Sequence, residues 1–261
     1  MLNLWGKNTF FKLFCMSIKS QIPNIITLLN LFCGCIAVVF AFQYEYEYAF
    51  FFVCLGIFFD FFDGFFARLF KVQSELGLQL DSLADMVTSG VVPGIVMFQL
   101  LLKSFGASQV INVNSWDNSV MLLPFLGFII TLGACFRLAN FNIDTRQTDS
   151  FIGLPTPANA LFIMSLPLVI QYSSVAFITT NLQCSRVLLV ITFLSAYVMN
   201  AEIPLFSLKI KDFSFQKNAL QLFFLLVSSL LLVFLGYLGI PLVIVFYVLL
   251  SVVNNFFLKK I

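Results

Sequence analysis

The chain has 261 residues, of which 61% are hydrophobic and only 10% are charged, and its formal net charge at pH 7 is +2. Soluble globular proteins carry about 25% charged residues, so this composition excludes a soluble protein and predicts an integral membrane protein. We expect no nucleic-acid partner. The chain has no histidine, so acid–base chemistry near neutral pH has to come from carboxylates or metal-bound groups.

The first 22 residues predict an amphipathic helix that lies in the membrane interface. Lys7, Lys12 and Lys19 are interspersed with large apolar side chains such as Phe10 and Phe14. This apolar stretch is too short and too interrupted for the core of a cleaved signal peptide. Lysines along one polar side are typical of interfacial helices. No linker divides the rest of the chain, so we expect a single transmembrane domain over residues 23–257.

Eight apolar runs of about 20 residues are each long enough to cross the hydrocarbon core of a bilayer. Their approximate ranges are 23–42, 49–70, 80–102, 120–140, 157–174, 186–204, 218–236 and 238–256. The fifth run is short and contains Pro167, and a tight turn from Gly236 to Pro241 separates the last two. The expected fold is therefore an all-α, polytopic helical bundle with about eight transmembrane helices.

The distribution of basic residues predicts that the N- and C-termini are both cytoplasmic. In that orientation every lysine and arginine except Lys103 and Arg186 lies inside, and the acidic, aromatic turn 44–48 lies outside. The end of the second span and the start of the third then face the cytoplasm. We therefore expect a multi-pass protein of the cell membrane whose polar site opens to the cytoplasm.

Four aspartates lie in the second and third predicted spans, where an ionised side chain costs about 2.5–3.5 kcal/mol or more. Asp60 and Asp63 are three residues apart and Asp81 and Asp85 are four apart, so each pair shares one helix face. The polar turn 71–75 would bring the two faces together. Oxygen donors without nitrogen or sulfur suit hard cations such as Mg²⁺, Mn²⁺ or Ca²⁺. Phosphoryl chemistry is the expected activity, because Mg²⁺ often bridges carboxylates to substrate phosphates.

Small residues accompany the aspartates on the same helix faces. Gly64, Ala67 and Gly77 would let a flat or elongated ligand approach the helix backbone. Arg68 would offer a fixed positive charge to a phosphate or a carboxylate. Close helix–helix packing is the alternative explanation for the small residues, but it does not account for four carboxylates in the same patch.

Together these residues form the pattern Asp60-x2-Asp63-Gly64-x2-Ala67-Arg68-x8-Gly77-x3-Asp81-x3-Asp85. At every fixed position the pattern resembles the signature of the CDP-alcohol phosphatidyltransferase family (class I CDP-alcohol phosphotransferases). The resemblance implies a membrane enzyme, usually a homodimer, that moves a phosphatidyl group from a CDP-linked lipid to an alcohol and releases CMP.

The resemblance also implies a role for each part of the motif. Asp60, Asp63 and Asp81 would hold one or two divalent ions, Mg²⁺ or Mn²⁺, on the diphosphate. Asp85 would be the catalytic general base and would also be within reach of a metal. A wall of the nucleotide pocket would be formed by Asn24, Thr27 and Asn30, three residues apart at the start of the first span, although capping of a helix N-terminus would also explain them. The predicted CDP-lipid-binding residues are Asn24, Thr27, Gly64, Ala67, Arg68 and Gly77.

A second cytoplasmic stretch, between the fourth and fifth spans, bears on the acceptor alcohol. It contains Arg137, Asn142 and Arg146 and ends in the string Pro155-Thr-Pro157-Ala-Asn159. This stretch resembles the branch of the family that uses CDP-diacylglycerol and L-serine, although that branch commonly has an arginine where this chain has Asn140. Arg137 or Arg146 would pair with the serine carboxylate, and Asn142, Asp144 or Asn159 would accept from its ammonium group. The two prolines would also suit a loop that simply ends at the fifth span.

The resulting hypothesis is a phosphatidyl transfer from CDP-diacylglycerol to L-serine that yields phosphatidylserine and CMP. One alternative keeps the family and changes the acceptor to glycerol 3-phosphate, an inositol derivative or choline. A more distant alternative is a cation- or proton-coupled transporter. A translocation path needs polar residues that reach both faces, whereas the charges here are confined to one side.

Overall fold

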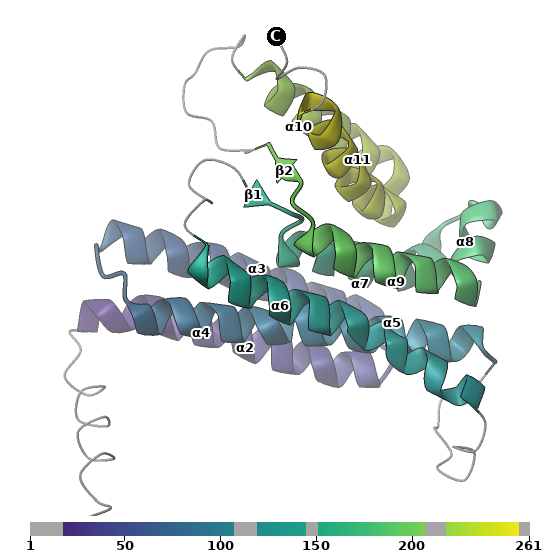
Figure 1. The fold of residues 1–261 in the computed structure, drawn as a ribbon, viewed down its shortest axis with the longest axis horizontal. Coiled ribbons are helices and arrows are strands. Elements are labelled where there is room, and N and C mark those ends of the chain that lie inside the picture. Colours follow the sequence, from purple (N-terminus) through teal and green to yellow (C-terminus); the bar gives the residue numbers. More distant parts are fainter. Residues whose placement is uncertain (1–17, 107–118, 145–150, 207–217, 256–261) are drawn as a thin grey trace, which may run out of the picture.

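The structure is a computed structural model that describes residues 18–106, 119–144, 151–206 and 218–255 (Figure 1). The predicted interfacial helix falls almost entirely outside the described residues, and its last residues begin the first helix. The first half of the described chain consists of α2 (Ile18–Phe42), α3 (Tyr46–Leu69), α4 (Glu75–Asp85), the π-helix η1 (Met86–Val91) and α5 (Val92–Ser104).

The second half begins with the 3₁₀ helix η3 (Ser119–Phe128), which runs directly into α6 (Ile129–Ile143). It continues with β1 (Phe151–Ile152), α7 (Thr156–Tyr172), α8 (Ala176–Leu182), α9 (Ser185–Asn200), β2 (Pro204–Leu205), α10 (Ala219–Leu235), the 3₁₀ helix η4 (Gly236–Leu238) and α11 (Gly239–Val253). The two short strands pair antiparallel, with Phe151 opposite Leu205.

These helices confirm a polytopic helical membrane protein. Five stretches among the described residues are long and apolar enough to cross a membrane, or six if α8 and α9, bent by 76°, count as one span. One of the five is 219–253, and it folds back on itself, since Phe224 of α10 stacks on Phe246 of α11 with ring centroids 5.9 Å apart. The count of eight spans and the side on which the termini lie stay predictions.

The continuous helix from α4 through η1 to α5 is the most enclosed part of the bundle. Of its most apolar window 78% is buried, against 22% for α3. Met97 and Leu101 of α5 and Ile163 and Met164 of α7 are fully buried, and they form the centre of the core. The outward faces of α3 and α10 carry many exposed phenylalanine and leucine side chains, which suits contact with lipid.

Local chemistry explains the turn between α3 and α4, which shapes the site below. Lys71 has a positive φ of 56°, which stops α3 and reverses the chain. Ser74 then caps α4, because its Oγ accepts a hydrogen bond from the Gly77 amide at 3.0 Å. The turn therefore sets the end of α3 beside the start of α4.

Candidate active site

Three of the four signature aspartates converge where α3 and α4 meet. Asp60 and Asp63 of α3 and Asp81 of α4 each offer a carboxylate oxygen, and these oxygens all lie within 4.8 Å of one another. Asp63 is only 6% exposed. Negative charges at this separation repel strongly in a poorly solvated site, so the cluster needs a compensating positive charge.

The donor set fits a hard divalent cation. All of its ligand atoms are carboxylate oxygens, which Mg²⁺ and Mn²⁺ favour. Asp81 Oδ1 is buried and has no hydrogen-bond partner, and buried polar atoms without a partner are rare in folded proteins. A cation between the three carboxylates would supply the partner that this oxygen lacks.

Asp85 lies one helical turn beyond Asp81 and has different surroundings. It is the last residue of α4 and is 7% exposed. Its Oδ1 accepts a hydrogen bond of 3.0 Å from Nδ2 of Asn30, a fully buried residue of α2. The other three aspartates form the mutually close group, whereas Asp85 is held separately by an amide.

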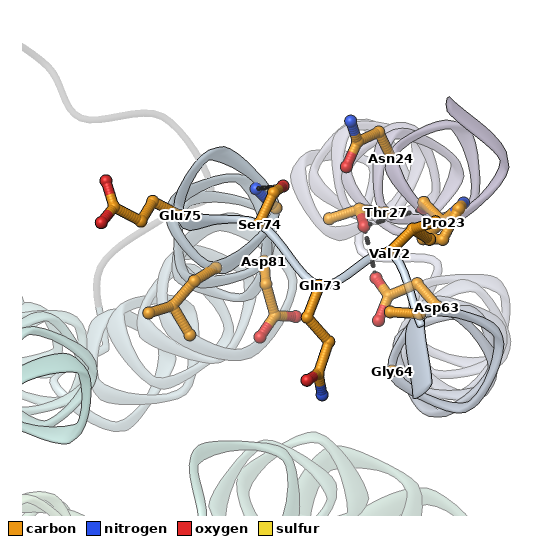
Figure 2. Close-up of a pocket in the computed structure, with 13 residues that line it drawn as sticks. Pro23, Asn24, Thr27, Asp63, Gly64, Val72, Gln73, Ser74, Glu75 and Asp81 are labelled. Atoms are coloured by element: carbon orange, nitrogen blue, oxygen red, sulfur yellow. Dashed lines mark hydrogen bonds between the residues drawn. The ribbon is translucent and has the colours of Figure 1, made fainter. Parts of the chain in front are cut away.

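A first cavity of about 410 Å³ opens on one side of the cluster (Figure 2). It lies between the start of α2, the end of α3 and the turn that leads into α4. Thr27 lines this cavity, and its Oγ1 donates to Asp63 Oδ2 at 2.5 Å and lies 3.0 Å from the Pro23 carbonyl oxygen. The predicted CDP-lipid residues that line the cavity are Asn24, Thr27, Gly64, Ala67 and Gly77.

The two glycines of this cavity differ in the room around them. A Cβ atom on Gly64 would meet nothing closer than the Arg68 guanidinium nitrogens at 3.8 Å. A Cβ on Gly77 would lie 3.2 Å from Ser74 Oγ and 3.4 Å from Asn24 Oδ1. The space at Gly64 is therefore open to a ligand, while Gly77 also relieves packing within the protein.

A second cavity of about 400 Å³ lies on the other side of the cluster. Asp63, Gly64 and Asp81 line both cavities, so the two spaces meet at the carboxylates. The remaining walls of the second cavity come from α3, α4, α6 and the start of α7. The lining includes Asp60, Arg68, Ser82, Asp85, Arg137, Phe141, Pro155, Thr156 and Pro157.

The predicted acceptor residues are distributed unevenly. Arg137 lines the second cavity, but its NH1 also donates to the carbonyls of Ile152 at 2.8 Å and Met199 at 2.7 Å. It therefore ties α6 to β1 and to the end of α9. Asn142 lies against α4, where its side-chain amide is 3.0–3.1 Å from the Ser82 hydroxyl. Arg146 lies outside the described residues.

Several contributors to this site did not follow from the sequence. Ser82 of α4 and Thr88 of η1 belong to no motif that the sequence showed, although both are within three residues of a signature aspartate. Asn30 is a different case: its three-residue spacing from Thr27 predicted a place in the polar wall of the nucleotide pocket, whereas it is completely buried and lines neither cavity. The π-helix that starts at Met86 has no recognisable sequence signal, although such distortions are frequent at functional sites.

Comparison with known proteins extends these observations. The model of the CDP-alcohol phosphatidyltransferase family matches residues 20–199. The chain is similar to the CDP-diacylglycerol–serine O-phosphatidyltransferase of Bacillus subtilis, with 33% identity over 151 residues, 56% of this chain and 75% of the relative. It is also similar to the Helicobacter pylori enzyme of that name, with 28% identity over 214 residues, 81% of each chain. The Saccharomyces cerevisiae enzyme of that name is 34% identical over 125 residues, 44% of this chain and 40% of the relative.

The family match spans more than half of the chain. It contains the carboxylate cluster, Asp85 and the lining of both cavities. The signature residues from Asp60 to Asp85 thus lie in the matched region and meet in space around one site. The chain belongs to the CDP-alcohol phosphatidyltransferase family.

Proposed function

We propose that the protein transfers the phosphatidyl group of CDP-diacylglycerol to the hydroxyl of L-serine, giving phosphatidylserine and CMP. The observation that carries this proposal is the meeting of two cavities at one carboxylate cluster. Two substrates can then reach a common centre from different sides. The names of the similar proteins, all CDP-diacylglycerol–serine O-phosphatidyltransferases, support serine as the acceptor.

The first cavity is the proposed binding site for the CDP portion of the lipid. Its lining includes the small residues Gly64, Ala67 and Gly77, so a nucleotide can approach the helix backbones closely. Asn24 and Thr27 add polar groups along α2. Thr27 also holds Asp63 by a hydrogen bond, and this contact fixes one carboxylate at the point where the diphosphate would arrive.

Asp60, Asp63 and Asp81 are the proposed ligands of one or two divalent ions, Mg²⁺ or Mn²⁺. Such an ion, when bound, would neutralise charge on the diphosphate and favour departure of CMP. Arg68 lines the second cavity next to these carboxylates, and its guanidinium adds a permanent positive charge for phosphate oxygens. The negative charge that develops on the departing CMP would thus be stabilised by the bound ion and by Arg68.

Asp85 is the proposed general base. The serine hydroxyl would enter from the second cavity and give its proton to Asp85, while its oxygen forms a bond to the phosphorus that carries diacylglycerol. The bond from that phosphorus to the CMP oxygen breaks, and CMP leaves with the electron pair. Arg137 and Arg146, the latter outside the described residues, are the proposed partners of the serine carboxylate.

The proposed location is the cell membrane, with the site on the cytoplasmic side and the protein a homodimer. Cys184 is exposed between α8 and α9, and α8 lies at the opposite end of the bundle from the turn that joins α3 to α4 (Figure 1). In intact cells a membrane-impermeant maleimide should label Cys184, and Cys184→Ser should abolish that labelling. Glu75→Cys, in a background in which Cys15 and Cys184 are both replaced by serine, should react only after lysis. The reverse labelling pattern would invert the topology, and light scattering in detergent would test the dimer.

The decisive experiment supplies membranes that contain the protein with CDP-diacylglycerol, Mg²⁺ or Mn²⁺ and labelled serine. We expect phosphatidylserine and CMP in equal amounts, and neither product with Asp81→Asn membranes. Glycerol 3-phosphate, an inositol derivative and choline serve as parallel acceptors. Product from one of these but not from serine would refute the acceptor and keep the family activity.

A further inference from the structure

A buried chain of hydrogen bonds stands behind Asp85 and connects three helical elements. Thr88 Oγ1 of η1 donates to Asn30 Oδ1 of α2 at 2.8 Å, and Asn30 Nδ2 donates to Asp85 Oδ1 of α4 at 3.0 Å. Asn30 and Thr88 are both completely buried. Neither residue lines the two cavities at the carboxylates, so both act behind the site.

The hydrogen bonds from Thr88 through Asn30 to Asp85 all run in one direction, from donor to acceptor. Thr88 Oγ1 lies near two acceptors, Asn30 Oδ1 at 2.8 Å and the Asn30 carbonyl at 3.2 Å, so its hydroxyl hydrogen is directed toward Asn30. The amide oxygen of Asn30 is thereby engaged, and its NH₂ group has to face Asp85. Since an NH₂ group only donates, the oxygen of Asp85 that it meets is held as an acceptor.

Two glycines of the surrounding helices make room for these hydrogen-bonded side chains. A Cβ atom on Gly34 of α2 would lie 2.5 Å from Thr88 Oγ1. A Cβ atom on Gly56 of α3 would lie 2.8 Å from both Asn30 Oδ1 and Thr88 Cγ2. Real Cβ atoms do not approach so closely, so both glycines are required by the polar pair rather than by helix contact alone.

We propose that Asn30 and Thr88 are positioning residues that hold Asp85 in the orientation needed to take the proton of the acceptor hydroxyl. This inference rests on the function proposed above. Asp85 Oδ1 is fixed by the buried amide, and Asp85 also lines the second cavity, so Oδ2 is the oxygen presented to the acceptor. The separate anchor also distinguishes Asp85 from the three aspartates whose oxygens converge.

Valine substitutions at two buried threonines, Thr88 and Thr27, test the proposal because they should affect different kinetic constants. Thr88→Val removes the hydroxyl that orients Asn30, and we expect kcat to fall about 10- to 100-fold, since small displacements of a reacting group cost up to about 10²-fold. The KM for CDP-diacylglycerol should change less than about twofold. Thr27→Val removes the hydroxyl that contacts Asp63 in the first cavity, and it should raise that KM instead.

Two further variants separate positioning from packing. Thr88→Ser retains the hydroxyl and should recover most of the wild-type kcat. Thr192→Val removes an equally buried hydroxyl, which donates to the Leu188 carbonyl within α9, and should leave both kinetic constants within about twofold of wild type. Asn30→Ala should lower kcat at least as much as Thr88→Val; if it fails to fold, the Thr88 pair still decides.

The outcomes are distinguishable from failure of the proposed function. Suppose that the wild type makes phosphatidylserine while Thr88→Val keeps its kcat, or while the kcat of Thr88→Ser falls as far as that of Thr88→Val. Either result refutes the positioning role and leaves the proposed function intact. If the wild type uses another alcohol, the serine assignment fails, and the same variants are compared with that alcohol by CMP release. A wild-type protein that releases no CMP with any acceptor overturns both proposals.

Discussion

The two cavities at the carboxylate cluster are built in different ways. The first is made from three short segments, at the start of α2, the end of α3 and the start of α4, all within residues 23–81. The second draws on α3, α4, α6 and the start of α7, so its walls come from residues as distant as Asp60 and Pro157. Chemistry shared by a whole family can be written in a local motif, whereas recognition of a particular acceptor is assembled from distant parts of the chain.

Arg68 illustrates the boundary between the two regions. It belongs to the local motif, yet it lines the second cavity rather than the first. Asp63, Gly64 and Asp81 line both. The proposed reaction centre is therefore the wall that both cavities share, and substitutions can be sorted by whether they alter this wall, the proposed nucleotide side or the proposed acceptor side.

The largest effect should come from the shared wall. Asp81→Asn removes a charge from the cluster of three carboxylates, and we expect turnover to fall by at least about 1,000-fold. Loss of several kcal/mol of transition-state stabilisation has this size, because about 1.4 kcal/mol corresponds to a factor of ten. CMP release from CDP-diacylglycerol and serine measures it.

A carboxylate at the other end of the bundle provides the control for this substitution. Glu47 of α3 accepts a hydrogen bond from Tyr172, far from the cluster, so Glu47→Gln should keep near-normal turnover. A chelator should abolish turnover by the wild type, and added Mg²⁺ or Mn²⁺ should restore that turnover. Full activity of Asp81→Asn at wild-type metal concentration would rule out the cluster as a metal site.

A slightly smaller loss is expected on the acceptor side of the wall, at Asp85. Asp85→Asn keeps the shape of the side chain and removes its ability to take a proton, so kcat should fall about 10²- to 10⁴-fold. Binding of CDP-diacylglycerol, measured directly by equilibrium binding, should be largely retained. A loss of binding as severe as in Asp81→Asn would make Asp85 mainly a metal ligand.

Arg137 should show an intermediate effect with two components. Arg137→Met removes the hydrogen bonds to the Ile152 and Met199 carbonyls, and we expect unfolding in detergent to become easier by roughly 2–4 kcal/mol. It should also raise the KM for serine more than that for CDP-diacylglycerol. Arg146→Ala is the comparison: we expect the same kinetic split, and an equal rise in both KM values would indicate a phosphate contact instead.

The contrast between the cavities also explains what could be predicted from the sequence. Spacings of three and four residues put Asp60, Asp63 and Asp81 on facing helix stripes, and the short turn at Lys71 brings those stripes together. Helical periodicity and a tight turn are local properties, so the approach of Asp81 to Asp60 and Asp63 followed directly. The all-α membrane fold followed from composition in the same way.

The remaining features depend on packing between distant segments. The double role of Arg137 requires β1 and the end of α9 beside α6, and Asn142 meets Ser82 across α4 and α6. Neither contact leaves a periodic trace in the sequence. The number of spans stays a prediction, because α7 and α10 have 17 residues each and α11 has 15, shorter than the usual length of about 20.

The smallest expected effect tests the nucleotide side alone. Gly64→Ala adds a methyl group where the nearest protein atoms, the Arg68 nitrogens, are 3.8 Å away, so the protein should fold with an unchanged thermal midpoint. The methyl group would project into space shared by the two cavities. We expect the KM for CDP-diacylglycerol to rise about tenfold, because crowding of a fitted ligand typically costs about 1–3 kcal/mol, while the KM for serine changes less. A larger effect on serine would mean that the acceptor, rather than the nucleotide, lies against Gly64 and would exchange the assignments of the two cavities.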